Sequence, residues 1–112
     1  MRMTNVLFIC GKARKRSPTA AEVAAGRFNV QTDFAGLSAD ADERLGAEQI
    51  AWADIIAVME RRHLRRLKQL FGSALRGKKL TCLEIPDRYE FMQPELVDLV
   101  IRKLRPVITK RD

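Results

Sequence analysis

Along the chain, almost uninterrupted apolar runs of strand length alternate with longer segments in which apolar residues recur every three or four positions. A short run with few polar breaks is typical of a strand buried on both faces, whereas the longer spacing is typical of an amphipathic helix. Strands are therefore predicted over residues 5–9, 32–37, 54–59 and 78–85. Helices are predicted over residues 17–28, 42–53, 60–71 and 93–108, and we expect Pro106 to end or bend the last one.

Strands that alternate with helices form a parallel sheet that is covered on both faces. A chain of 112 residues without repeats or linker-like segments is long enough for one core. We predict a single domain over residues 1–112, of the α/β class, with three α/β/α layers and a four-stranded parallel sheet in the flavodoxin-like order 2-1-3-4. The active crevice of such a sheet lies beyond the carboxyl ends of the strands. Two loops should meet there, one that begins at Cys10 and one over residues 85–92.

The first of these loops carries a concentration of positive charge. Five residues separate Cys10 from Arg16, and Ser17 and Pro18 follow, where Ser17 can cap a helix and Pro18 suits its first turn. A loop between a buried strand and a helix can curl its backbone N–H groups around an anion at the positive end of the helix. The same field would stabilise a cysteine thiolate, and the neighbouring basic side chains would add to it. Arg16 offers a planar fork that can hold two oxygens of a phosphoryl group.

Net charge and cysteine content add little to the prediction of an anion-binding loop. The formal charge of +7 allows an anionic partner, and residues 61–79 are rich in basic residues without an acidic one, although such a helix face is usually only solvated. On that face we expect His63 to be exposed and inert. Two cysteines are too few for a disulfide framework and lack zinc-site spacing, so a reducing cytoplasm is the default and Cys82 is assigned to the core. No apolar run reaches the ~20 residues that a membrane span needs.

The stretch VLFICGKARKRSPTAAEV resembles the phosphate loop of the low-molecular-weight protein-tyrosine phosphatases, and residues 53–70 are similar to the third strand and following helix of that family. Asp87-Arg88-Tyr89 stands where the family carries Asp-Pro-Tyr. The chain looks like a short variant of this family, and the resemblance implies that Cys10 attacks phosphorus and that Arg16 and the loop amides bind the phosphate. It further implies that Asp87 is the general acid and base. The substrate-binding residues that it implies are Gly11, Lys12, Ala13, Arg14, Lys15, Ser17 and Tyr89.

The implied roles of two of these residues are specific. Ser17 would hydrogen-bond the sulfur of Cys10 and ease its departure, and Tyr89 would line the mouth against the ring of the substrate. The resemblance implies a phosphorylated protein or a small phosphomonoester as substrate and inorganic phosphate as product. It implies no metal and no other cofactor, because the loop itself neutralises the phosphate.

The sequence departs from the family in two places. Residues 36–48 contain no aromatic residue where relatives carry one wall of the phosphotyrosine slot, which leaves the preference for phosphotyrosine open. The loop lacks the asparagine that supports its backbone in relatives, and Lys15 stands where many members keep a second cysteine.

Two other functions stay open from the sequence. Arsenate reductases of the same fold pass a disulfide from the loop cysteine through two downstream cysteines, whereas this chain offers only Cys82. The loop could instead be a non-enzymatic anion-binding nest, with residues 61–79 binding nucleic acid or an acidic protein. The basic residues have no interleaved aromatics of the kind that single-strand binders use, so nucleic acid is not favoured.

Overall fold

A computed structural model describes residues 3–108 of the chain. Its four strands are all parallel and lie in the order β2-β1-β3-β4, as predicted. The strands are β1 (Thr4–Cys10), β2 (Val30–Gly36), β3 (Ile55–Val58) and β4 (Lys79–Cys82). The helices are α1 (Arg16–Arg27), α2 (Ala47–Trp52), α3 (Arg61–Phe71), the 3₁₀ turn η1 (Gly72–Leu75) and α4 (Pro94–Ile108).

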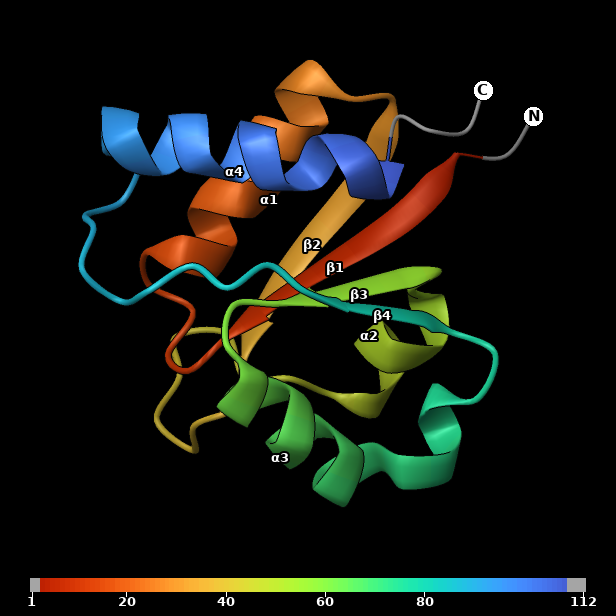
Figure 1. Ribbon diagram of the computed structural model, residues 1–112. Coiled ribbons are helices and arrows are strands. Elements are labelled where there is room, and N and C mark those ends of the chain that lie inside the picture. Colours follow the sequence, from red (N-terminus) through yellow and green to blue (C-terminus); the bar gives the residue numbers. More distant parts are fainter. Residues whose placement is uncertain (1–2, 109–112) are drawn as a thin grey trace.

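The sheet is covered on both faces, so the three-layer prediction is confirmed (Figure 1). Alternate residues of β1 point to opposite sides, as the pleat requires. Phe8 and Cys10 belong to the core under α1 and α4, while Leu7 and Ile9 belong to the core under α2 and α3. Because β1 has a neighbour on each edge and a helical layer on each face, its residues from 6 to 10 are all buried.

Two predicted elements are shorter in the structure than in the sequence pattern. The helix expected over residues 42–53 begins only at Ala47. The backbone N–H of Asp42 donates to Lys12, that of Leu45 donates to Gly36, and Gly36 donates to the carbonyl of residue 43. Those backbone groups are therefore unavailable to a helix.

The strand expected over residues 78–85 ends at Cys82, although the N–H groups of Leu83 and Ile85 still donate to the carbonyls of Val58 and Met59. At the other end of the chain, α4 continues past Pro106 to Ile108.

The carboxyl ends of β1 and β3 and the segment that follows β4 meet at one edge of the sheet (Figure 1). The N–H of Met59 donates to Ile9, and the N–H of Ile85 donates to Met59. These bonds bring the loop after Cys10, the start of α3 and the segment from Ile85 onward into contact. The convergence of the two predicted loops is confirmed.

Candidate active site

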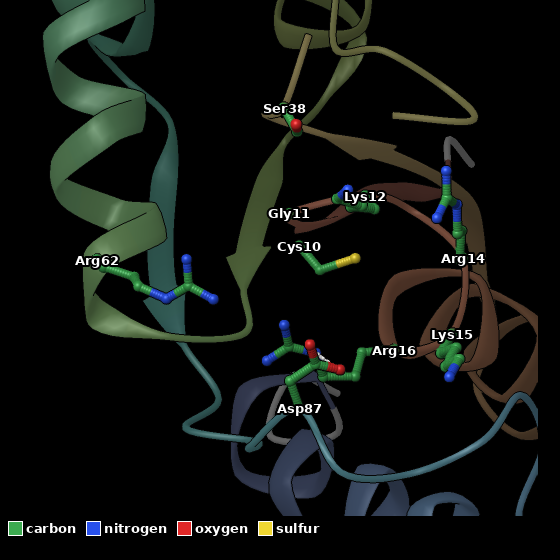
Figure 2. Close-up of a pocket in the computed structure, with 9 residues that line it drawn as sticks. All are labelled: Cys10, Gly11, Lys12, Arg14, Lys15, Arg16, Ser38, Arg62 and Asp87. Atoms are coloured by element: carbon green, nitrogen blue, oxygen red, sulfur yellow. Dashed lines mark ion pairs between the residues drawn. The ribbon is translucent and has the colours of Figure 1, made fainter. Parts of the chain in front are cut away.

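A cavity of about 370 Å³ lies at that edge (Figure 2). The loop after β1 supplies most of its wall, and single side chains from three other segments complete it. Its lining residues are Cys10, Gly11, Lys12, Arg14, Lys15, Arg16, Ser38, Arg62 and Asp87. A volume of this size accommodates a small phosphorylated group.

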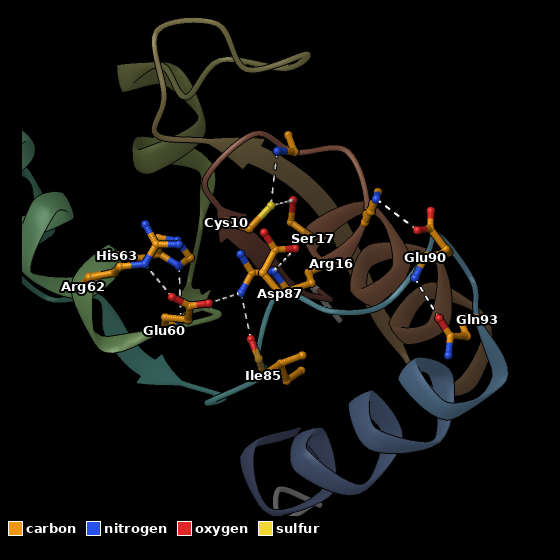
Figure 3. A network of polar contacts seen from close by, with 12 residues as sticks. Cys10, Arg16, Ser17, Glu60, Arg62, His63, Ile85, Asp87, Glu90 and Gln93 are labelled. Atoms are coloured by element: carbon orange, nitrogen blue, oxygen red, sulfur yellow. Dashed lines mark hydrogen bonds and ion pairs between the residues drawn. The ribbon is translucent and has the colours of Figure 1, made fainter.

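Cys10 is the last residue of β1 and is only 3% exposed. The backbone N–H of Ala13 donates to its Sγ at 3.2 Å, and Ser17 Oγ lies 3.1 Å from the same sulfur (Figure 3). Both groups can donate to a thiolate, which is the nucleophilic form of cysteine. Ala13 holds a positive φ of 61°, an unfavourable conformation for alanine that directs its amide toward the sulfur.

The prediction that Ser17 caps the first helix is wrong. The helix begins at Arg16, its N-cap residue is Lys15, and no side chain caps it. Ser17 lies inside the first turn, fully buried, and its hydroxyl faces Cys10 instead of the backbone. Pro18 lies in the first turn, as predicted.

Four loop amides are left without a protein partner. Within residues 3–108, the N–H groups of Gly11, Lys12, Arg14 and Lys15 donate to no backbone or side-chain acceptor. The same four residues line the cavity at the amino end of α1. Unpaired amides in a loop that precedes a helix form an anion-binding nest, and the helix dipole adds to its attraction for negative charge.

The side chain of Arg16 is buried and held from several sides. Its Nη1 donates to Glu60 Oε2 at 2.5 Å and to the carbonyl of Ile85 at 2.8 Å (Figure 3). Its Nε lies 3.7 Å from Asp87 Oδ1. These contacts fix the plane of the guanidinium group, so Arg16 needs little reorganisation before it binds an oxyanion.

Glu60 joins Arg16 to a second arginine that sequence reasoning did not identify. Oε1 of Glu60 accepts a hydrogen bond from Arg62 Nε at 2.5 Å, while Oε2 accepts from Arg16. Burial alone would raise the pKa of the Glu60 carboxyl, but the hydrogen bonds from Arg62 and Arg16 outweigh burial and lower that pKa. Glu60 is therefore a carboxylate at neutral pH.

The prediction that His63 is exposed and inert is wrong, because its side chain is buried at 3% exposure. Its Nδ1 accepts the backbone N–H of Glu60 at 3.1 Å, which leaves the proton of the neutral ring on Nε2. Nε2 is buried without a partner and lies 3.9 Å from where a Cβ on Gly11 would stand. Burial, together with the charges of Arg16 and Arg62, lowers the pKa of His63 to about 4. The imidazole under the loop is thus neutral at physiological pH.

The segment that follows β2 supports the loop from outside. The N–H of Leu37 donates to Cys10, that of Ser38 to Gly11, and that of Asp42 to Lys12. Three ion pairs then fasten basic loop residues to neighbouring segments; they are Lys12–Asp40 at 3.0 Å, Arg14–Asp42 at 3.1 Å and Lys15–Glu90 at 3.2 Å. Segment 37–42 thereby supports the backbone of the loop.

The structure brings Asp87 into the cavity but does not bring Tyr89 there. The Asp87 side chain is 63% exposed, so an incoming group can reach it. Tyr89 is absent from the cavity lining; its ring packs against the core under α1 and α4, and Arg88 lies 5.8 Å from its centroid.

Cys82 ends β4 and is half-buried against the core on the opposite face of the sheet from Cys10. Strand β3 lies between β1 and β4, so the two Cα atoms stand about 10 Å apart at normal strand spacing. A disulfide needs Cα atoms within about 7 Å. The two cysteines therefore cannot be joined directly without movement of the backbone.

Residues 3–108 contain neither a metal-binding cluster nor a helix of membrane-spanning length. In the part of the chain that the structure describes, no three His, Cys, Asp or Glu residues are grouped so that they could hold a metal ion. No helix between residues 3 and 108 is long and apolar enough to cross a membrane.

Solved phosphatase structures share this fold. Wzb of Vibrio vulnificus, solved in complex with benzylphosphonate, superposes with a TM-score of 0.74 at 21% identity, over 95% of this chain and 97% of that chain. The low molecular weight protein tyrosine phosphatase of Streptococcus pyogenes gives 0.75 at 16% identity, over 96% and 95%. The YwlE arginine phosphatase of Geobacillus stearothermophilus gives 0.69 at 19% identity, over 93% and 92%.

No protein-family model matches the chain, and neither does any curated protein sequence. The expected resemblance to low molecular weight phosphatases is thus confirmed for the fold.

Proposed function

We propose that this chain is a cysteine-dependent phosphohydrolase that cleaves phosphomonoesters, aryl phosphates of the phosphotyrosine type among them, through a phosphocysteine intermediate. The observation that carries the proposal is the position of one sulfur. Cys10 Sγ accepts the Ala13 N–H and contacts the Ser17 hydroxyl, at the base of a cavity whose loop amides have no protein partner. A nucleophilic sulfur below loop amides that are free to bind an oxyanion is the arrangement that phosphoryl transfer to cysteine requires.

In the first step, the Cys10 thiolate attacks phosphorus, and the bond from phosphorus to the ester oxygen breaks. The loop amides and the Arg16 fork bind the three equatorial oxygens, where the charge of the transition state is spread. Asp87, in its protonated form, gives its proton to the departing oxygen, so an alcohol or phenol leaves. Its position 3.7 Å from Arg16 Nε sets the carboxyl beside the phosphate-binding fork.

In the second step, the Asp87 carboxylate takes a proton from water, and the water oxygen attacks phosphorus. The sulfur–phosphorus bond breaks, inorganic phosphate forms, and the Cys10 thiolate is restored. The Ser17 hydroxyl, 3.1 Å from the sulfur, donates a hydrogen bond to the thiolate as it leaves. Apart from the substrate, the two steps use only the side chains and loop amides of this chain and water.

The class of substrate is inferred from the solved structures that share the fold and from the residues near the cavity. Two of the solved structures that share the fold are described as a tyrosine phosphatase and an arginine phosphatase. Tyr89 remains a proposed contact for the substrate, and its ring packs against the core in this structure. An aryl phosphate is therefore the first substrate to test, with a phosphorylated protein or a small phosphomonoester as the natural candidates.

The proposal is tested with para-nitrophenyl phosphate at mildly acidic pH in the absence of added metal. Cys10→Ser and Arg16→Ala should abolish turnover, and Asp87→Asn should slow it by about 10²–10⁴-fold, the range for loss of a general acid. Cys82→Ser and Asp98→Asn, which remove the other cysteine and an exposed carboxylate of α4, are the matched controls. Turnover that survives in Cys10→Ser would disprove the mechanism.

The two alternatives predict different results in the same set of proteins. Arsenate reduction would require thiol-dependent turnover of arsenate that is lost in Cys82→Ser, which the separation of the two cysteines argues against. A purely anion-binding protein would hydrolyse no phosphomonoester and would bind nucleic acid with steep salt dependence.

A further inference from the structure

Arg62 stands on the cavity wall that α3 provides, across from the phosphate loop. Its guanidinium group reaches from the first turn of α3 toward Cys10 and Arg16 (Figure 2). The side chain is 61% exposed, so it can meet a ligand as the ligand enters. The proposed hydrolysis of phosphate esters assigns no role to this residue.

The contacts of Arg62 leave its outer nitrogens available. Its only hydrogen bond within residues 3–108 runs from Nε to Glu60, so Nη1 and Nη2 donate to no other group there. Because Glu60 is itself held by Arg16, the Nε bond fixes the direction of the second guanidinium relative to the first. An arginine that is oriented through Nε presents two parallel N–H groups, which match the two oxygens of a carboxylate.

The other exposed cations of the cavity are already occupied. Lys12, Arg14 and Lys15 each form an ion pair with a carboxylate outside the cavity. Arg16 is buried and serves the phosphate. Arg62 differs from the three exposed cations because its carboxylate partner, Glu60, is shared with Arg16. The charge of Arg62 is therefore only partly balanced, and its outer nitrogens can meet the part of the substrate beyond the phosphorus atom.

The cavity also lacks the surface that would select a neutral aromatic ring. None of the residues that line it in the described part of the chain is aromatic, and the ring of Tyr89 packs against the core outside it. Selection of the leaving group must therefore depend mainly on charge and hydrogen bonding. Asp87 adds no repulsion in the first step, since it enters that step as the neutral acid.

We propose that Arg62 is a specificity-determining residue that binds a carboxylate on the leaving group, so that the preferred substrates are phosphomonoesters with a second, carboxylate charge near the ester oxygen. This inference rests on the proposed phosphohydrolase function and adds the class of substrate. It places phosphate in the amide nest and Arg16, and the carboxylate in the Arg62 fork.

The test compares two aryl phosphates of nearly equal shape, 4-carboxyphenyl phosphate and 4-carbamoylphenyl phosphate. The measured quantity is the ratio of their kcat/KM values, which cancels any effect that a variant has on both. In Arg62→Gln the ratio should fall about tenfold, the effect of losing one charged hydrogen-bonding partner. Arg61→Gln removes the same charge from the neighbouring residue, which pairs with Glu84 and does not line the cavity, so its ratio should stay within twofold of the unmodified chain.

The inference is overturned if the kcat/KM ratio is the same in the unmodified chain and in Arg62→Gln. It is also overturned if the ratio falls as much in Arg61→Gln as in Arg62→Gln, which would indicate a non-specific effect of positive charge. If the chain hydrolyses neither ester, the proposed function fails. The role of Arg62 can still be decided by calorimetry, which measures the binding of 4-carboxybenzylphosphonate and 4-carbamoylbenzylphosphonate. Tighter binding of the carboxylate that is lost in Arg62→Gln supports that role, and equal binding of both compounds refutes it.

Discussion

The buried imidazole of His63 should make the stability of the fold depend on pH in a way that one substitution can isolate. The chain contains a single histidine, whose pKa falls from 6.5 to about 4 in the folded state. The groups that act on the ring are Arg16, Arg62, Glu60 and Asp87, of which the two arginines outweigh the carboxylates. Burial contributes most, since it disfavours the charged ring.

The sign of the effect follows from proton binding. Between pH 6.5 and pH 4 the unfolded chain binds a proton at His63 that the folded chain does not bind. Stability therefore rises with pH through this window, is fully present above pH 6.5, and is lost as the pH falls toward 4. A tenfold change in proton affinity corresponds to about 1.4 kcal/mol, so the folded state loses about 3 kcal/mol across the window.

The perturbation is His63→Gln, which removes the titrating group and keeps an acceptor for the Glu60 N–H, as glutamine does at this position of a capping box. Urea unfolding between pH 7 and pH 4, followed by the fluorescence of the single tryptophan, Trp52, gives both stability curves. Buffers should be free of phosphate, because an anion in the cavity would stabilise the folded state. The carboxylates titrate in both proteins, so the difference curve reports His63 alone. A difference that stays constant within about 0.5 kcal/mol would refute the argument.

Two further predictions concern the loop. Gly36→Ala should destabilise the fold by about 2–3 kcal/mol and impair turnover, because the new Cβ would stand 2.5 Å from the carbonyl oxygen of Gly11. The control is Gly26→Ala in α1, where the new Cβ meets nothing within 4 Å and should stabilise the fold by about 0.5–1 kcal/mol. Denaturant unfolding measures the stability of both variants. Equal effects at both glycines would contradict the close packing at Gly36. Ser17→Ala should slow the breakdown of the phosphocysteine about 10–100-fold, because the departing thiolate loses a hydrogen-bond donor. Rapid-quench kinetics should then show a burst of the phenol product. A linear time course at an unchanged rate would contradict the proposed role of the Ser17 hydroxyl.

The sequence allowed the sheet order and seven of the nine cavity residues to be predicted. A continuous apolar run marks a strand that is covered on both faces, and the order of the strands brings the ends of β1 and β3 and the segment after β4 to one edge. The meeting of the loops that carry Cys10, Arg16 and Asp87 follows from that rule, the role of Asp87 was implied by the family resemblance, and all three residues line the cavity. Glu60 could have been found in the same way, since it follows the end of β3, between the strands that lead to Cys10 and Asp87.

The burial of His63 could not be predicted from local pattern. It lies among arginines and lysines in a segment whose charge favours a solvated face. The first turn of α3, however, abuts the phosphate loop, and the imidazole reaches Glu60 on one side and Gly11 on the other. The support that segment 37–42 gives to the loop was missed for a related reason, because it is made mainly of backbone hydrogen bonds, which side-chain identity does not encode.

The basic side chains of the loop contribute less to the electrostatic field at Cys10 than their number indicates. The sequence predicts that the basic side chains all add to the field at Cys10, yet the three exposed ones each pair with a carboxylate on a neighbouring segment. Such exposed pairs each contribute at most about 1 kcal/mol to stability and largely cancel one another's field in water. The field that the sulfur meets must then come mainly from the unpaired loop amides, the amino end of α1 and the buried Arg16. Because backbone amides do not titrate, the contribution of the loop amides to the binding of an oxyanion should be independent of pH and only weakly screened by salt.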